Sequence, residues 1–586
     1  MGIKRYTANA DTTITNAYKA NLQTRGTGSN MGLADSLEVF HIYGQESSSS
    51  AENSRVLIDF PVTTTITSDR SAGTIPASGS VSWFLRVHNV AHPSTLPRNY
   101  NMTILAVSSS WDEGTGMDME EYSDVGATSW LYRNDTPAAA TGTITVTSNP
   151  SSGNFTVTVA GTTVTVTRGV STTATATAIK TALNNDVTIG ALVTATSLAA
   201  VVTITADTGG SAGNYAYSAT NGNGTITAAG SIMTGGLAYT LWTAEGGDYH
   251  ASTTGSTAYF DDGTEDIEID ISHLVEEWVK GLSGGAKGNI YGVGIRMENE
   301  SAFSSSYTKK FSARGSQYFF NRPTLEARWD SATKDDRGNF YYSSSLAPAA
   351  DNLNDVYLYN YSRGRLVDIP GIGSGDNIYV NLYASASDVP SGSALTLCGG
   401  GGATGSWVST GVYSAPLCIT ASSTPLTTLH DVWSNLAQTV EYHTGSITPN
   451  SLNSSEQNSV SQVVMNITNL RDTYHRNENA RFRLYTRQKD WNPTIYTKAV
   501  STPDIHIVES GSFKVVRLID DLDVVAFGTG SDMHTQMSFD SSGSYFDVDM
   551  SMLEAGYGYG LKFAIYDGGA GAWNEYPDVF KFRVEE

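Results

Sequence analysis

Three acidic residues in one glycine-containing segment have the types and spacing that could bind a metal ion. Asp112, Glu113 and Asp118 are interspersed with Gly114 and Gly116. Carboxylate oxygens are the ligands that Ca²⁺ prefers, and glycine lets a loop fold around the ion. Because the spacing differs from that of an EF-hand loop, a solvated turn is the favoured interpretation and a calcium loop is the alternative. These three residues are the candidate metal site, and Ca²⁺ is the one cofactor considered.

A second segment matches a catalytic pattern by its letters alone. Residues 209–213 read Gly-Gly-Ser-Ala-Gly, which satisfies the Gly-x-Ser-x-Gly of a nucleophile elbow. That motif needs a strand-to-helix turn, whereas this segment is surrounded by Gly, Ala and Ser and no helical period follows it. The match to the Gly-x-Ser-x-Gly pattern therefore reflects the Gly-, Ala- and Ser-rich composition of this segment and does not indicate a catalytic serine.

Other catalytic signatures are missing from the chain. The sequence has no His-Glu-x-x-His, no Cys-x-x-Cys and no dinucleotide-binding glycines. A carboxylate pair for glycoside hydrolysis would come together only in the fold, and no aromatic-rich motif surrounds a candidate pair. We therefore expect that the protein is not an enzyme.

Charge and hydropathy narrow the choice of partners. The chain has 586 residues, with 35 Lys and Arg against 58 Asp and Glu, which gives a net charge of −23. Such an acidic surface repels phosphate backbones, so we expect no nucleic-acid partner. No run of about 18 apolar residues is present, so we expect no membrane insertion. The first six residues run straight into polar sequence without a signal-peptide core, which favours an origin inside a cell.

The two cysteines, Cys398 and Cys418, flank a glycine-rich stretch and could face each other across a hairpin. Disulfides are rare in the cytoplasm. A free buried thiol pair is therefore favoured over a disulfide.

Short strands are the elements that must position these residues. Apolar and polar residues alternate through segments 36–40, 54–60, 81–87 and 102–107, with Gly, Asn and Ser between them. The length requires several domains of about 100 to 200 residues each. The sequence therefore predicts a mainly β protein made of several β-sandwiches, of jelly-roll or Ig-like type, with one small α+β module.

Most of residues 10–330 resembles the DNRLRE β-sandwich module. The match begins with Asp11-Thr12-Thr13-Ile14, passes through an Asn/Gly turn and continues into residues 54–60, which read Ser-Arg-Val-Leu-Ile-Asp-Phe. Further matching segments are 111–116, 126–130, 267–278, 291–295 and 322–327. The resemblance implies one β-sandwich formed by residues 1–140 together with 237–332.

The segment from 141 to 236 interrupts this module. It consists largely of Thr, Val, Ala, Gly and Ser, with an alternating hairpin at 155–166, a helix at 173–183 and a strand pair at 192–195 and 201–206. This ββαββ order resembles small modules inserted into tail and fibre proteins of tailed bacteriophages. We therefore expect an inserted domain, since loop tips tolerate insertions.

Two further β-sandwiches are predicted after a linker at 335–339. Turn signals recur at Ig-like spacing in residues 333–450, and segments 430–433 and 441–447 resemble the closing strands of Ig-like modules in phage neck and tail proteins. Residues 451–586 form the last predicted sandwich. Its Leu553-x-x-Gly556-x-x-Tyr559 pattern is typical of a tyrosine corner.

These resemblances imply a structural protein of a tailed-bacteriophage virion. It would be a neck or collar, tail, fibre or capsid-exterior protein assembled in the host cytoplasm, and its partners would be other virion proteins, copies of itself and, for an exposed appendage, host-surface glycans. The alternative is a surface carbohydrate-binding or adhesion protein, which should show exposed aromatic rings and a Ca²⁺ site. A glycan-degrading spike is a third option and needs a carboxylate pair in a groove.

Overall fold

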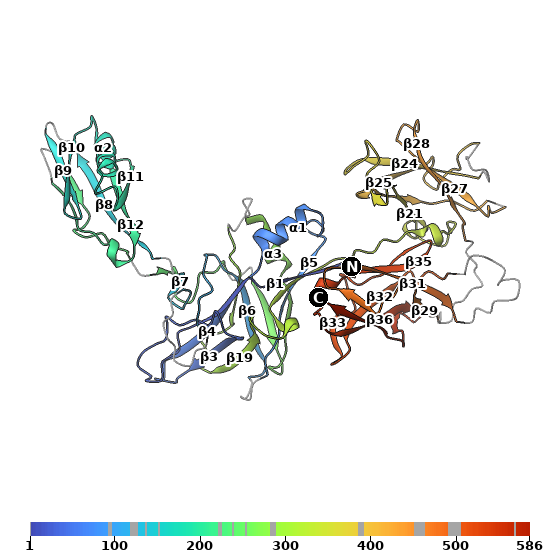
Figure 1. The fold of residues 1–586 in the computed structure, drawn as a ribbon, viewed down its shortest axis with the longest axis horizontal. Coiled ribbons are helices and arrows are strands. Elements are labelled where there is room, and N and C mark those ends of the chain that lie inside the picture. The colour runs from blue at the N-terminus through green and yellow to red at the C-terminus, as the bar shows by residue number, and fades with distance from the viewer. Residues whose placement is uncertain are drawn as a thin grey trace. The chain divides into compact units, whose positions relative to one another are not determined.

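The computed structural model describes residues 2–586 apart from 92–96, 118–126, 135–136, 150–152, 221–224, 237–238, 252–254, 282–288, 385–391, 423, 451–462, 490–504 and 568–569. Antiparallel sheets dominate these residues, which confirms the predicted mainly β, multi-sandwich fold class (Figure 1). The chain divides into two compact units, Arg5–Glu326 and Ala327–Glu586, the latter together with Met1–Lys4. No helix of the described residues is both long and apolar enough to cross a membrane.

The first unit contains a sandwich of two sheets. The smaller sheet has the order β1 (Ile3–Thr7), β20 (Thr324–Arg328), β5 (Ser82–Val87) and β17 (Ile267–Asp270). The larger one has the order β16 (Ser256–Phe260), β6 (Tyr100–Ala106), β18 (Val293–Met297), β4 (Ala51–Asp59), β3 (Ser36–Tyr43) and β19 (Ser306–Ser312), with β2 (Ala10–Thr15) paired to β4. Successive residues Val56, Leu57 and Ile58 are all fully buried because β4 is covered on both faces.

Helix α3 (Ser272–Gly281) packs on this sandwich through one apolar face. Leu274, Val275 and Trp278 are buried, and their spacing places them on one face of the helix. A short helix, α1 (Thr67–Ser71), precedes β5 in the sequence. Its Arg70 forms a bidentate ion pair with Glu276 of α3 at 2.6 and 2.7 Å. The ion pair joins the two helices.

The interrupting segment builds two small sheets and one helix around its own core (Figure 1). One sheet has the order β10 (Thr162–Thr167), β9 (Asn154–Val159), β13 (Tyr217–Thr220), and the other has the order β11 (Val193–Leu198), β12 (Val201–Gly209), β8 (Ala139–Ser148), β14 (Thr225–Ala228). Helix α2 (Thr172–Asn185) is capped by Ser171, whose hydroxyl accepts from the main-chain N–H of Ala174 at 3.1 Å. The predicted hairpin and helix are confirmed, whereas β8, β13 and β14 were not predicted.

The ends of this module lie next to each other. Thr141 and Thr234 exchange main-chain hydrogen bonds of 2.8 and 2.9 Å. Immediately outside them, β7 (Tyr132–Asn134) pairs with β15 (Thr240–Leu241). The chain therefore enters and leaves the module through a narrow two-stranded ribbon.

The second unit begins with a six-stranded sheet. Its order is β21 (Asn354–Tyr359), β26 (Val412–Leu417), β25 (Ala403–Ser409), β24 (Asn377–Tyr383), β27 (Leu429–Ser434), β28 (Glu441–Ile447), and a small hairpin of β22 (Tyr361–Ser362) and β23 (Arg365–Leu366) follows β21. The apolar alternation of residues 394–397 predicts a strand, but this prediction is wrong, because these residues are irregular. Leu395 and Leu397 nevertheless pack on the core of this sheet, which explains their apolar alternation.

The rest of the unit is a two-sheet sandwich with an aromatic core. One sheet contains β29 (Val463–Ile467), β31 (Asn479–Gln488), β35 (Gly543–Asp549) and β34 (Ser538–Asp540), and the other contains β30 (Thr473–His475), β38 (Phe580–Glu585), β36 (Gly558–Asp567), β32 (Gly511–Arg517), β33 (Leu522–Val525) and β37 (Ala572–Glu575). Phe513 and Phe546 stack between the sheets at 4.2 Å between ring centroids. Tyr559 is fully buried and its hydroxyl donates to the Glu554 carbonyl at 2.7 Å, which confirms the predicted tyrosine corner.

The predicted linker at 335–339 is a tightly held segment within this unit. The main-chain N–H of Asp335 donates to the Phe539 carbonyl at 3.0 Å, and Arg337 forms two hydrogen bonds of 2.7 Å with the fully buried carboxylate of Asp431. Asp336 accepts from the main-chain N–H of Asp355 at 2.7 Å. Burial, reinforced by nearby acidic groups, raises the pKa of Asp336 to about 7.

We expect the Asp336→Asn variant to lose less stability than the wild type as pH rises. A carboxyl group whose folded pKa is raised stabilises the fold fully below its unfolded pKa near 3.8, and this contribution is lost as pH rises through about 7. Calorimetry between about pH 4 and pH 8 should show that the free energy of unfolding of the variant increases relative to that of the wild type by about 1 kcal/mol. The exposed Asp578→Asn variant is the control, and an identical pH profile for Asp336→Asn and wild type would contradict the assignment.

Candidate functional site

Glu113 of the candidate calcium loop is held by an ion pair inside the first unit. Both of its carboxylate oxygens accept hydrogen bonds from the guanidinium of Arg314. Its Oε1 also accepts from the main-chain N–H of Asp11 at 2.9 Å. The pairing with Glu113 raises the pKa of Arg314 above its ordinary value. Glu113 therefore joins the loop to strand β2 and to the segment after β19.

The loop packs closely against the Asn/Gly turn near the start of the chain. The main-chain N–H of Gly116 donates to Asn30 Oδ1 at 2.8 Å. A Cβ on Gly116 would lie 1.9 Å from the Asn30 carbonyl oxygen, and a Cβ on Gly32 would lie 2.1 Å from that of Glu113. These glycines permit close contact between two backbones.

The other acidic residues do not complete a metal site in the described residues. The main-chain N–H of Asp112 donates to Thr128 Oγ1 at 3.0 Å and to the Arg133 carbonyl at 3.1 Å, and Asp118 lies outside the described residues. Within the described parts of the chain, no three His, Cys, Asp or Glu side chains are grouped as around a metal ion. Calcium binding by Asp112, Glu113 and Asp118 stays a prediction.

A pocket of about 260 Å³ lies beside the same loop. Its lining includes Trp111, Trp278 and Asp59. The Trp111 indole N–H donates to the Tyr291 carbonyl at 2.8 Å, whereas the indole N–H of Trp278, a residue 2% exposed, has no hydrogen-bond partner in the described structure. Burial raises the pKa of Asp59 to about 6. Asp59 is the one carboxylate among the lining residues described, so this pocket does not supply the pair that glycoside hydrolysis needs.

Trp130 belongs to the core rather than to an exposed surface. It is 4% exposed and packs with Ile14, Leu57 and Trp242. Trp111 is partly buried against the same cluster.

Arg55, the central residue of the DNRLRE-like strand, has a structural role. Its guanidinium forms hydrogen bonds of 2.6 and 2.8 Å with Glu300, and a third of 2.6 Å with the Gly246 carbonyl. The guanidinium carbon lies 4.8 Å from the centre of the Trp130 ring. A hollow of about 610 Å³ opens beside Arg55. These hydrogen bonds all go to other parts of the chain, so the side chain ties β4 to loops distant in sequence.

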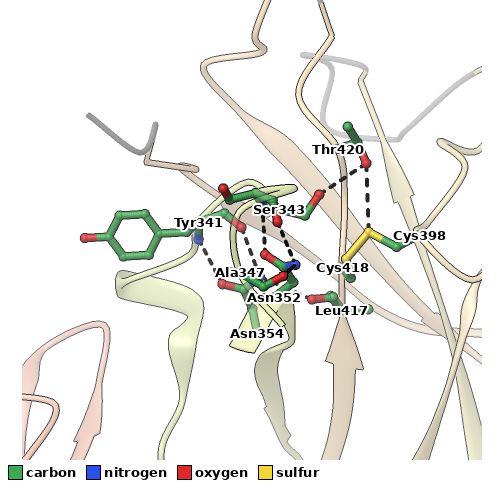
Figure 2. The surroundings of a disulfide bond; sticks show 10 residues. Tyr341, Ser343, Ala347, Asn352, Asn354, Cys398, Leu417, Cys418 and Thr420 are labelled. Atoms are coloured by element: carbon green, nitrogen blue, oxygen red, sulfur yellow. Dashed lines mark hydrogen bonds between the residues drawn. A yellow bond between two sulfur atoms is a disulfide. The ribbon is translucent and has the colours of Figure 1, made fainter. Parts of the chain in front are cut away.

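A groove of about 950 Å³ lies in the second unit. It lies between the segment 343–353, the loop 397–404 and the end of β26, and none of its 18 lining residues is charged. Figure 2 shows how the amides of Asn352 and Asn354 hold the first of these segments. Asn352 Nδ2 donates to the Ser344 carbonyl at 3.0 Å, and Asn354 Nδ2 donates to the Leu417 carbonyl at 3.2 Å.

A disulfide between Cys398 and Cys418 forms part of this groove (Figure 2). The favoured free thiol pair is therefore wrong. The main-chain N–H of Cys398 donates to the carbonyl of Cys418 at 2.9 Å, which brings the two Cα atoms to 5.4 Å, within bonding range. The prediction of free thiols was based on the rarity of disulfides in the cytoplasm. The position of the two cysteines on either side of a hairpin was the better indication, because it allows their sulfur atoms to meet.

Sequence reasoning missed one buried polar cluster in the first unit. Lys309 of β19 is fully buried and contacts the side chain of Asn89. A signal was present, because Lys309 stands two residues before the buried Phe311 and therefore on the core face of the strand. This signal does not by itself predict a buried lysine, because two adjacent lysines such as Lys309 and Lys310 are more often exposed.

Comparison with known proteins identifies no family for this chain. No protein-family profile matches the chain, and no curated protein matches it either. The class that the structure defines is a multi-domain, mainly β protein whose described residues include several internally paired charges and an uncharged groove.

We expect reduction of the disulfide to destabilise the second unit by about 3 kcal/mol, the value for a closed loop of this length. Its cysteines are 20 residues apart in sequence. Chemical denaturation of the wild type with and without reductant, and of the Cys398→Ser/Cys418→Ser variant, measures the effect. The double variant should not respond to reductant. Two reactive thiols in the unfolded, unreduced wild type would contradict the disulfide.

Proposed function

We propose that this chain is a structural component of a tailed-bacteriophage virion, a neck, collar, tail or capsid-exterior protein that acts through protein–protein contacts. Its partners are other virion proteins and copies of itself. The resemblances of the first sandwich, of the inserted module and of residues 333–450 support this proposal, together with the multi-sandwich architecture. Symmetric particles repeat one contact surface many times, so each copy needs well-formed docking surfaces.

The uncharged groove beside the disulfide is the observation that carries the proposal. Charged residues make up 16% of the chain and its net charge is −23, yet none of the 18 residues that line the groove is charged. Leu353 lines the groove at 50% exposure, and Leu346, in the turn next to it, is 94% exposed. The centres of protein–protein interfaces are depleted in charge, and contiguous exposed apolar surface marks an interaction site.

The pairing of charges supports the same proposal. Arg55 with Glu300, Arg314 with Glu113 and Arg337 with Asp431 connect segments distant in sequence. These groups stabilise the fold, and their hydrogen bonds leave little capacity for a substrate. Such an arrangement suits a protein whose task is to hold a shape.

We expect the Leu346→Asp/Leu353→Asp variant to fold normally and to be excluded from virus particles. A charge on each exposed position would be buried without a partner in the assembled interface. Incorporation is measured by complementing particles that lack the wild-type chain, with copy number from quantitative mass spectrometry and position from electron microscopy. The Leu198→Asp variant, which changes a leucine 85% exposed in the inserted module, is the control.

Two results would contradict the proposal. One is the absence of the wild-type chain from purified virus particles of its source. The other is equal incorporation of the groove variant and the control, which would leave the groove without a role in assembly.

A carbohydrate-binding or adhesion protein is the second candidate, and the pocket beside Trp111 is the observation that favours it. The unpaired indole N–H of Trp278 and the carboxyl group of Asp59 face a space of about 260 Å³. Sugar hydroxyls could accept from the first and donate to the second. We expect calorimetric titration with a panel of monosaccharides and short oligosaccharides to detect binding that the Trp278→Phe variant loses. Equal heats for both proteins would remove this candidate.

A further inference from the structure

Lys309 is a lysine buried in the core of the first sandwich. It is 0% exposed, and its ammonium nitrogen donates to three oxygens: Asn89 Oδ1 at 2.7 Å, the Gly263 carbonyl at 2.9 Å and the Glu265 carbonyl at 2.8 Å. None of these three acceptors carries a charge. A buried ammonium without a carboxylate in direct contact is costly, so its neutral form becomes accessible.

Aromatic rings surround the amine. The ring centroids of Phe260 and Phe311 lie 5.0 and 5.3 Å from Lys309 Nζ, and Tyr100 stacks on Phe260 at 4.9 Å. This desolvation lowers the pKa of Lys309 to about 8, against the opposing effects of Glu265 and Asp266. A desolvated lysine near neutral pH is a nucleophile.

The carboxamide of Asn89 is fixed next to this amine. Asn89 continues β5 and forms an antiparallel bridge with Phe311 of β19, flanked by main-chain hydrogen bonds from Val90 to Lys310 and from Ser312 to His88. Asp266 accepts from the main-chain N–H of Asn89 at 2.7 Å, and its other oxygen lies 3.1 Å from His88 Nδ1. Both strands are therefore held in place, and the Lys309–Asn89 contact is preorganised.

We propose that Lys309 and Asn89 condense within the folded chain into an isopeptide bond that joins β19 covalently to the continuation of β5. The lone pair of neutral Lys309 Nζ attacks Asn89 Cγ, and a new Nζ–Cγ bond forms. A proton passes from Nζ to Nδ2 in the tetrahedral intermediate. The Cγ–Nδ2 bond then breaks and ammonia leaves. The reaction conserves all atoms and electrons and needs no oxidant, metal or cofactor.

Glu265 is the acidic group whose negative charge assists the attack, because it favours the positive charge that develops on Nζ. Its Oε2 is buried and has no hydrogen-bond partner in the described structure, whereas Oε1 accepts from the main-chain N–H of Asp262 at 2.6 Å. Among acidic groups, Glu265 also has the largest effect on the pKa of Lys309. Asp266 is a positioning residue, because its carboxylate oxygens hold the main chain of Asn89 and the ring of His88.

The bond would connect the two sheets of the sandwich. Strand β5 belongs to the four-stranded sheet and β19 to the larger one, and the two residues are 220 positions apart in sequence. The cross-link would close a loop that contains the inserted module. It goes beyond the proposed function and does not depend on it.

The test is the mass of the full-length wild-type chain after reduction of its disulfide. We expect a mass lower than the sequence mass by about 17 Da, the mass of one ammonia molecule lost in the acyl transfer. Trypsin should release residues 87–98 joined to residues 297–310, because a modified Lys309 is no longer cleaved. Fragmentation of the joined peptides should place the link between Asn89 and Lys309.

Matched variants identify the groups involved. Lys309→Arg keeps the positive charge and should restore the full sequence mass, whereas Lys310→Arg, which changes the neighbouring residue, should keep the loss. Glu265→Gln should reduce the cross-linked fraction at least tenfold in freshly purified protein, and an unchanged fraction would overturn its role in assisting the attack.

The overturning results concern the wild type and so do not depend on how any variant folds. A full sequence mass, with Lys309 and Asn89 recovered in separate unmodified peptides, would show that Lys309 is only a buried ammonium held by three oxygens. A loss of ammonia confined to a single peptide, as in succinimide formation, would overturn the proposal equally.

Discussion

Three ion pairs between segments far apart in sequence neutralise buried or partly buried charges in this chain, and the arrangement of the sheets depends on them. Arg55 of β4 reaches Glu300, 245 residues later, and Arg314 reaches back 201 residues to Glu113. In the second unit Arg337 reaches the fully buried Asp431. Breaking such a pair leaves an uncompensated charge in the interior, which costs about 3 to 5 kcal/mol. Each pair therefore favours one register of its strands over all others.

The same pairs explain why acidic residues that suggest chemistry in the sequence have structural roles here. Glu113 stands in a segment whose composition suits a calcium loop, but its hydrogen bonds go to Arg314 and Asp11. The identity of an acidic residue gives no information about a basic partner two hundred positions away. Short-range patterns cannot reveal such a partner.

Local patterns predicted much of the fold and little of the site. Alternation located the strands around Arg55, helix α2 was expected at nearly its observed position, and the pattern around Tyr559 identified a corner whose hydrogen bond is present. These features depend on neighbours within about ten residues. The Lys309 cluster depends on how strands distant in sequence pair. The disulfide closes a local span of 20 residues, but the sequence alone did not distinguish it from a pair of free thiols. The irregular segment 394–397 has a strand-like alternation because it covers a core. Tertiary packing decided these cases.

The two-stranded ribbon of β7 and β15 has a consequence for the history of the protein. The inserted module starts and ends at adjacent strands and has a hydrophobic core of its own, so in the described residues the host sandwich connects to it through two neighbouring points. Recombination could exchange such a cassette for another domain, or delete it, without repacking the rest of the unit. The host sandwich can thus keep its own structure while the domain inserted into it changes.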